Sequence, residues 1–501
     1  MANTLRISGL ASGMDIDKIV SDLMKAERAP LDKLKQKKQL LEWQRDDYRA
    51  MNTLLQGLDD YLFSNITLQS SMLKKTVSSS NESVVTATAG SSAANVAAAI
   101  QVNQVATSAV WLSDATKRVD KASFSVDADV TLTINVTNGD GTTKQAAITV
   151  KKGTTLDGVI AQLNSNLDLG VSAFYDEQTG RVSIMKKETG GRASLVLADQ
   201  TTADFFAQKL GFAGAIAGQE LPGKTAGKDA DITINGLRTT RSSNTFTING
   251  VTYTVKGTGT ATVSVATDAD AMFNAIKGFV DKYNETIAKI NAELKEERYR
   301  DYPPLTDEQK EAMTEKQIEL WEEKARSGML RGDSILSSAL SKMRMNVYTK
   351  VEGANIPSGF SQLAQIGITT SSNYLDGGKL IIDETKLREK IKENPDAVYQ
   401  LFNQDGATDA EKGIARRLRD TIKATIGKIE QKAGKTIWTN QQFAIGRDLI
   451  QINDQIDRFQ DRLKQIEDRY YRQFTAMEEA IQRANQQSMY LMNAFGGGMQ
   501  G

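Results

Sequence analysis

Both ends of the chain place apolar residues at helical spacing, whereas the middle of the chain does not. Toward the C-terminus the apolar positions alternate steps of three and four residues, which is the coiled-coil period. This face consists of Leu449, Ile452, Ile456, Phe459, Leu463, Ile466 and Tyr470, and after one added four-residue step it continues at Phe474, Met477 and Ile481. An apolar face of this length predicts a partner helix, from the same chain or from another copy.

The N-terminal region offers a candidate partner. A helix is predicted to start at the N-cap Asp15, with an apolar side formed by Ile16, Ile19, Val20, Leu23 and Met24. Pro30 predicts a break or a fresh first turn, because proline has no amide hydrogen for a helix interior. A second helix is predicted from about Leu31 to Leu62, and its apolar side includes Leu31, Leu34 and Leu41.

Two interpretations of these helices stay open. A single amphipathic helix usually packs inside its own domain. The length of the C-terminal stripe and its position near the end of the sequence favour assembly with other chains instead.

The middle of the chain is rich in Thr, Val, Ser and Gly, and its apolar residues alternate as in half-buried strands. Asn-Gly pairs at 235–236 and 249–250 predict tight hairpin turns between such strands. The segment between them and the first strands alternates strands with a short helix, which predicts a compact α+β insert. Because the insert separates two groups of strands, one β domain built from both groups is expected.

The predicted fold class is therefore α+β and multidomain, with terminal coiled-coil helices, a helical bundle domain and two β-rich domains nested in the middle. Each of these predicted parts except the insert combines two segments that are distant in the sequence. The predicted parts are terminal helices at 1–45 and 441–501, a helical domain at 46–75 and 269–440, a β-rich domain at 76–118 and 222–268, and an inserted α+β domain at 119–221.

Composition narrows the chemistry. The 501 residues exceed what one hydrophobic core organises, and the 62 basic residues equal the 62 acidic ones. This balance argues against a nucleic-acid partner. The chain has neither cysteine nor histidine, which removes disulfides, thiolate nucleophiles, Ser-His-Asp triads and the usual zinc ligands. We therefore predict no enzyme activity, catalytic residue, cofactor or metal site.

A phosphate-binding pattern and a search for membrane or signal segments do not alter the predicted class of protein. Residues 218–225 match G-x-x-x-x-G-K-[ST], but a small-residue linker precedes them and a strand is predicted to follow, so the strand and helix that phosphate binding requires are absent from the prediction. No stretch has the length and apolarity of a membrane span, and the first ten residues do not form a secretory signal. Membrane insertion is not expected.

Several strings resemble the bacterial flagellar filament cap protein family, also called hook-associated protein 2. The N-terminal string runs from Ile7 through Leu10 and Asp15 to Val20, and a β-domain repeat spans 232–236 and 248–253. Further similar strings lie at 279–284, 321–333, 366–383 and 394–402. The similarity covers nearly the whole chain in the family's order.

The resemblance implies a structural assembly factor rather than an enzyme. It implies a closed ring of copies, with a pentamer as the first expectation, that caps the filament tip and promotes insertion and polymerisation of exported flagellin. Flagellin, hook-filament junction proteins and an export chaperone of the flagellar type III system are the implied partners, and export occurs without a cleaved signal peptide.

The predicted oligomerisation and filament contacts lie on the terminal helices. They are Leu10, Ile16, Ile19, Val20, Leu23, Leu31, Leu34, Leu41, Ile452, Ile456, Phe459, Leu463, Ile466, Tyr470, Phe474, Met477 and Ile481. The alternative function is a secreted adhesin whose β domains bind host glycans or mucin.

Overall fold

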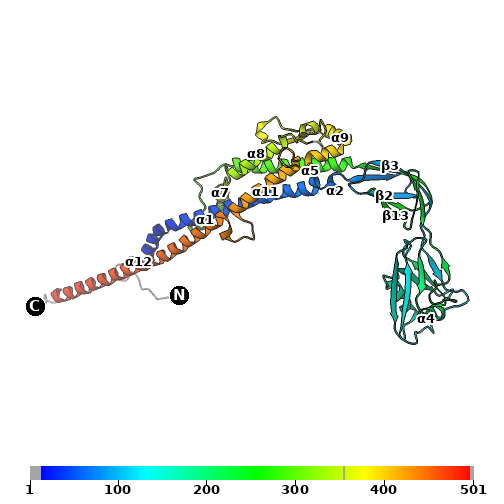
Figure 1. Cartoon of the computed structure of the whole chain (residues 1–501). Coiled ribbons are helices and arrows are strands. Elements are labelled where there is room, and N and C mark those ends of the chain that lie inside the picture. Colours follow the sequence, from blue (N-terminus) through cyan, green and yellow to red (C-terminus); the bar gives the residue numbers. More distant parts are fainter. Residues whose placement is uncertain (1–12, 354–355, 497–501) are drawn as a thin grey trace. The chain divides into compact units, whose positions relative to one another are not determined.

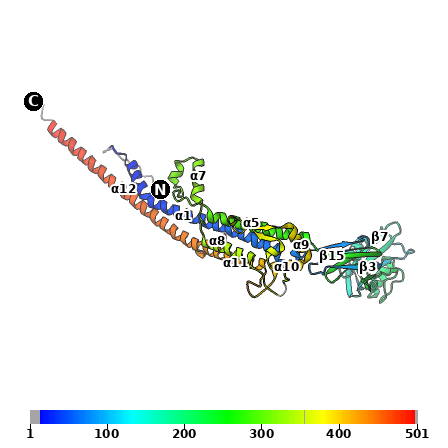
Figure 2. The same cartoon turned by 90° about the horizontal axis from the view of Figure 1, so that it is seen from above.

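The computed structural model describes residues 13–353 and 356–496 (Figures 1 and 2). The chain divides into two compact units, one formed by residues 1–68 and 273–501 and the other by residues 69–272. The first unit is mainly helical and the second is mainly β, so the predicted α+β multidomain fold class is confirmed. No helix among the described residues combines the length and apolarity that crossing a membrane requires.

The helical unit contains both long terminal helices. Its helices are α1 (Ile16–Tyr61), most of α5 (Ala269–Lys295), α6 (Asp307–Glu311), α7 (Glu315–Arg326), α8 (Ser334–Tyr348), α9 (Glu384–Glu393), α10 (Pro395–Asn403), α11 (Ile414–Ala433) and α12 (Ala444–Gly496). A π-helical turn, Leu62–Thr67, ends α1, and the short strands β16 (Ile368–Thr370) and β17 (Leu380–Ile382) form an antiparallel pair.

Helix α1 corrects one prediction. Asp15 caps it as predicted, accepting a hydrogen bond from the Lys18 amide at 3.0 Å. The predicted break at Pro30 is wrong, because α1 continues through it. Proline in a helix interior costs about 3 kcal/mol. Met24 and Leu31, on either side of Pro30, are buried in the same apolar cluster, and this burial offsets the lost backbone hydrogen bond.

Polar contacts fix α1 against the helices that follow in the chain. The Arg419 guanidinium of α11 pairs with Asp59 of α1 at 2.8 Å, and both side chains are largely buried. The Tyr48 hydroxyl of α1 donates to Asp333, which also caps α8 through the amides of Ile335 and Leu336. These bonds hold α1, α8 and α11 in one bundle.

The β unit begins with an antiparallel sandwich. Its larger sheet has the strand order β1-β15-β3-β11-β12 and its smaller sheet the order β13-β14-β2. The strands are β1 (Lys75–Ser79), β2 (Val85–Ala89), β3 (Val96–Gln104), β11 (Ala230–Ile234), β12 (Leu237–Arg241), β13 (Thr245–Ile248), β14 (Val251–Val255) and β15 (Gly259–Thr267). The two sheets share one apolar core.

The predicted Asn-Gly turns are confirmed. Asn235 and Gly236 have φ values of 47° and 85°, and Asn249 and Gly250 have values of 48° and 78°. Two successive positive φ values are those of the type I′ hairpin turn, which matches the twist of the flanking strands. These turns connect β11 to β12 and β13 to β14.

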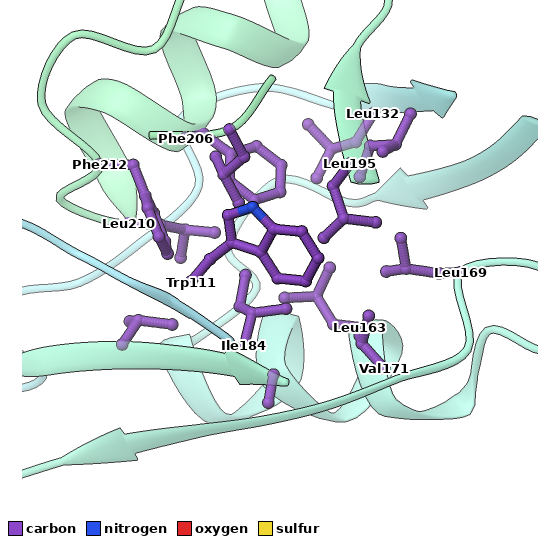
Figure 3. Packing of buried hydrophobic residues seen from close by; sticks show 14 of the residues in the cluster. Trp111, Leu132, Leu163, Leu169, Val171, Ile184, Leu195, Phe206, Leu210 and Phe212 are labelled. Carbon is purple, nitrogen blue, oxygen red and sulfur yellow. The ribbon is translucent and has the colours of Figure 1, made fainter. Parts of the chain in front are cut away.

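The inserted part of the β unit has its own core (Figure 3). One sheet has the order β10-β4-β8-β7 and the other the order β6-β5-β9. The elements are β4 (Val110–Leu112), β5 (Val130–Thr137), β6 (Thr143–Val150), α3 (Leu156–Ser165), β7 (Val171–Asp176), β8 (Arg181–Lys186), β9 (Ser194–Leu197), α4 (Gln200–Asp204) and β10 (Lys224–Thr225). The short helix α3 was predicted, with Thr155 as its N-cap.

Trp111 occupies the centre of this core, surrounded by Phe206, Ile184 and Leu163 (Figure 3). It belongs to β4, which lies before residue 119, and β10 lies after residue 221. Both strands nevertheless pair within the insert's sheet, where Trp111 is fully buried. The sheet of the insert thus extends beyond the predicted 119–221 range.

The phosphate-binding pattern at residues 218–225 ends in β10 rather than in a helix. Its lysine, Lys224, forms an ion pair with Glu220 at 2.6 Å and lies 5.8 Å from the centre of the Trp111 ring. A strand in this place does not direct a helix N-terminus at a phosphate. Lys224 instead covers the edge of the insert's core.

Gly278 yields a test of the close packing between α1 and α5. A Cβ atom at Gly278 would lie 2.1 Å from the hydroxyl oxygen of Tyr61, which donates to the Ala275 carbonyl at 3.0 Å. Glycine to alanine in a helix normally stabilises by about 1 kcal/mol. Here we expect Gly278→Ala to lower the free energy of unfolding by about 1–3 kcal/mol, measured by urea denaturation, because the side chains must shift.

Gly427 in α11 is the matched control, since nothing lies within 4 Å of a Cβ built there. Gly427→Ala should leave the free energy of unfolding unchanged or raise it. Equal effects of the two substitutions would show that α1 and α5 are not packed as described.

Candidate functional site

The first and last helices, α1 and α12, pack against each other within one molecule. The buried side chains of this contact come from α1 and α12, and we call it the seam. They are Ile16, Val20, Met24, Leu31, Ile452, Ile456, Leu463 and Ile466. Figures 1 and 2 show the two helices side by side, with α12 continuing past the start of α1.

Polar contacts establish that the two helices are antiparallel. The Tyr471 hydroxyl contacts Asp17, near the start of α1, at 3.1 Å. Farther along α1, the Arg49 guanidinium lies 5.5 Å from the centre of the Phe443 ring, directly before α12 begins. The start of one helix therefore lies near the far part of the other. Tyr470 adds a hydrogen bond to Glu27 at 3.1 Å, at the border of the seam.

Most of the predicted contact residues belong to this seam. Buried there are Ile16, Val20, Leu31, Ile452, Ile456, Leu463 and Ile466, and partly buried against them are Leu34, Leu41, Phe459, Tyr470 and Phe474. Ile19, Met477 and Ile481 are half-buried. Leu23 is 37% exposed, and Leu10 lies outside the described residues.

The sequence prediction missed two groups of residues. Tyr471 packs at the seam but was not predicted, since it falls one position after the heptad residue Tyr470. Met24, predicted on the apolar side of the first helix but left out of the predicted contacts, is buried there as well. Beyond the seam, α12 exposes the consecutive residues Met489, Tyr490, Leu491 and Met492. The heptad spacing reaches Leu491 in this group. The signal for the other three is the run of four apolar residues itself, which a search for one helical face overlooks.

A charged hairpin, formed by α6 and α7, covers a different side of α1. Three ion pairs connect them: Lys25 with Glu308 at 3.2 Å, Lys35 with Asp307 at 2.8 Å and Asp47 with Arg326 at 3.0 Å. Between α1 and the hairpin lies a groove of about 310 Å³ lined by lysines, carboxylates and glutamines. Surface ion pairs of this kind add roughly 0–1 kcal/mol each, so the hairpin guides α1 without fixing it strongly.

Burial and neighbouring charge shift the pKa values of several carboxyl groups on α1 and on the helices beside it. Burial raises the pKa of Asp32, although the Lys35 charge opposes this effect. A hydrogen bond from Lys35 lowers the pKa of Asp307. Burial also raises the pKa of Asp47, against the opposing hydrogen bond from Arg326. For Glu293, on α5, burial raises the pKa and the charges of Asp47 and Glu296 add to the shift.

No group of metal-ligating side chains occurs within residues 13–353 and 356–496. Burial and ion pairs between helices account for the shifted pKa values of these carboxyl groups. What the arrangement offers is mechanical: two helices joined by an apolar seam, one of which extends beyond its partner.

Comparison with known proteins gives matches along almost the whole chain. The family model for the flagellar hook-associated protein 2 C-terminus matches residues 227–486, and the model for its N-terminus matches residues 12–109. The Flagellin hook IN motif matches residues 131–195, inside the insert. The two hook-associated regions contain α1 and most of α12, and thus both sides of the seam.

Individual proteins agree with these matches. The flagellar hook-associated protein 2 of Halalkalibacterium halodurans is 35% identical over 544 aligned positions, covering 98% of this chain and 100% of that protein. The protein of the same name from Thermotoga maritima is 30% identical and covers 70% of this chain and 54% of that protein. The crystal structure of the D1-D2-D3 domains of the flagellar cap protein FliD from Escherichia coli has a similar fold, with a TM-score of 0.54 and 21% identity over 78% of this chain and 96% of that chain.

Substitutions on one helix separate the seam from the surface. Val20 is 1% exposed and Leu23 is 37% exposed. We expect Val20→Asp to bury an unpaired carboxylate and to accelerate amide hydrogen exchange in residues 16–31 and 452–474 at least tenfold. Leu23→Asp introduces the same charge on the exposed side and should change exchange little. A seam that tolerates Val20→Asp as well as Leu23→Asp would not have the described packing.

The raised pKa values predict a pH dependence. Because the folded state holds the Glu293 proton more tightly than the unfolded state does, the cost of charging this group is felt above its ordinary pKa near 4.5 and disappears as the pH falls. We expect Glu293→Gln to raise the urea midpoint at pH 7, with a gain that shrinks as the pH approaches 4.5. The exposed Glu389 on α9 is the control, and Glu389→Gln should not shift the midpoint. A pH-independent gain from Glu293→Gln would contradict this assignment.

Proposed function

The chain belongs to the flagellar hook-associated protein 2 family, and we infer from this membership that it caps the tip of the bacterial flagellar filament, outside the cell. It acts there as an oligomer in contact with the flagellin filament and promotes insertion and polymerisation of exported flagellin subunits. The observation that carries the proposal is that the regions matched by the family models contain the helices of the seam. The two hook-associated regions supply the two helices of the seam.

We propose that the terminal helices mediate contact with neighbouring copies and with the filament. In the single chain most of their apolar side chains are occupied by each other, so contact through the buried residues requires the seam to open. The first turns of α1 are held mainly by Ile16, Val20 and Met24. Each such side chain contributes about 1.5–3 kcal/mol when fully buried, before the entropy cost of ordering the helix, so opening this end is within reach of a competing helix.

Leu23 supports a contact that needs no opening. It lies at the border of the seam, three residues after Val20 and one before Met24, and is 37% exposed. The part of α12 beyond Phe474 offers a second such contact, since the exposed apolar residues gather there. We propose these two surfaces as the first points of contact with another chain.

We propose further that the copies form a closed ring, with a pentamer as the first expectation, through heterologous contacts. Hook-filament junction proteins and an export chaperone of the flagellar type III system are the other proposed partners, and nucleic acid is not one. The missing histidine and cysteine support a non-enzymatic role. Export without a cleaved signal peptide is part of the same proposal.

The four-part division of the chain also stays a proposal. The separate apolar cores of the sandwich and of the insert support two β-rich parts. The alternative function, an adhesin for host glycans or mucin, gains no support from the matches.

A truncation tests the proposed function. Removing residues 475–501 leaves every buried residue of the seam in place, so both units should keep their circular dichroism and thermal midpoint. In bacteria that lack the native protein, the truncated chain should fail to restore filament growth, whereas the full chain restores it. Flagellin should accumulate in the medium as monomer.

Loss of export would imitate loss of capping, so the truncated protein itself must be detected in the medium. If it is exported and filaments of normal length grow, the end of α12 has no part in capping.

A further inference from the structure

The charge pattern of α12 changes abruptly near Arg483. The helix carries 15 charged residues between Arg447 and Arg483, and no charged residue follows Arg483 in the sequence. The charged part is the part that packs against α1 on one side and exposes its charges on the others. The uncharged part lies beyond the seam, as Figure 1 shows for the red end of α12.

One turn of the uncharged part exposes apolar residues in all directions around the helix. Met489, Tyr490, Leu491 and Met492 are 64%, 76%, 53% and 73% exposed. Successive residues of an α-helix are rotated by about 100°, so four in a row point in directions that together span about 300°. A single partner helix covers one face only. A helical turn with apolar side chains in all directions is typical of a position with neighbours on several sides.

We propose that residues 484–493 of α12 are buried in a parallel bundle with the same segment of at least two other copies of this chain. The inference rests on the proposed ring and specifies which surface the copies share. It differs from the seam, which joins two helices of one chain.

Two features favour copies of this segment over other occupants. Identical helices packed in parallel bring identical residues together, and like charges at such positions are destabilising. The segment has no charge to repel its copies, whereas the preceding part of α12 has many. The segment also continues the line of the seam without interruption, since Phe474, Met477, Ile481, Ala484, Ser488 and Leu491 keep the alternating four-and-three spacing.

The polar residues of the segment fit the same arrangement. Gln486 and Gln487 carry uncharged amides that both donate and accept hydrogen bonds, and Ser488 does so through its hydroxyl. In parallel coiled coils an amide side chain at the interface fixes register and the number of strands. By contrast, a partner that covers only one face would leave Tyr490 or Met492 in water.

Cysteine cross-linking tests the bundle, because the chain has no cysteine of its own. Tyr490→Cys/Met492→Cys places thiols on opposite sides of the helix, about 200° apart. In full-length protein under mild oxidation, a copy with two different neighbours forms two disulfides, so non-reducing gels should show trimers and larger species. Gln455→Cys/Asp457→Cys has the same spacing at exposed positions of the charged part and should remain a single chain.

Cross-linked species no larger than dimers on the gel, or no cross-link at all, would contradict the proposed bundle. The same variant is assayed for filament growth under reducing conditions, so that the two proposals fail separately. If filaments grow normally but no cross-linked trimers form, the proposed cap function holds and the proposed bundle is wrong. A single-chain mass for the unmodified protein by light scattering counts against the ring itself. If the variant does not support filaments in reductant, Ser488→Cys/Tyr490→Cys repeats the measurement with Met492 intact.

Discussion

The apolar contact between α1 and α12 is the constraint on which the helical unit depends. It joins residues near the two ends of the sequence in an antiparallel pair. The chain between these helices must therefore leave α1 and return to α12 beside it. Arg49 of α1 strengthens the arrangement at the end of α11, by donating to the carbonyl groups of Ala433, Gly434 and Lys435. A cation at the C-terminal end of a helix also complements the helix dipole.

Much of the fold follows from local patterns in the sequence. The alternating apolar residues and Asn-Gly pairs predicted the β hairpins, because positive φ values at two successive positions are accessible to few other residue pairs. The uninterrupted passage of α1 through Pro30 was not predictable in this way. Local propensity favours a break there, and only the partner helix, which buries Met24 and Leu31 together, reverses the preference.

The candidate site was predictable as a set of residues but not as an arrangement. Heptad spacing identifies which side chains need an apolar partner, and it cannot say whether the partner is in the same chain. Leu23 shows the limit: its spacing resembles that of Val20, yet it is exposed, because the seam is narrower than the apolar face of the helix. Trp111 shows another limit, since its burial depends on strands that are distant in sequence.

The route by which the chain leaves the helical unit has a consequence for evolution. The exit at Thr67 is anchored by the Tyr399 hydroxyl, and the Asn403 amide holds Ile66 at 2.7 Å. In the β unit the first and last strands, β1 and β15, are neighbours, so the chain enters and leaves that unit side by side. Insertions and deletions between residues 69 and 272 can therefore accumulate while the register of α1 against α12 stays the same. The chain separates a part free to diversify from a part bound by its geometry.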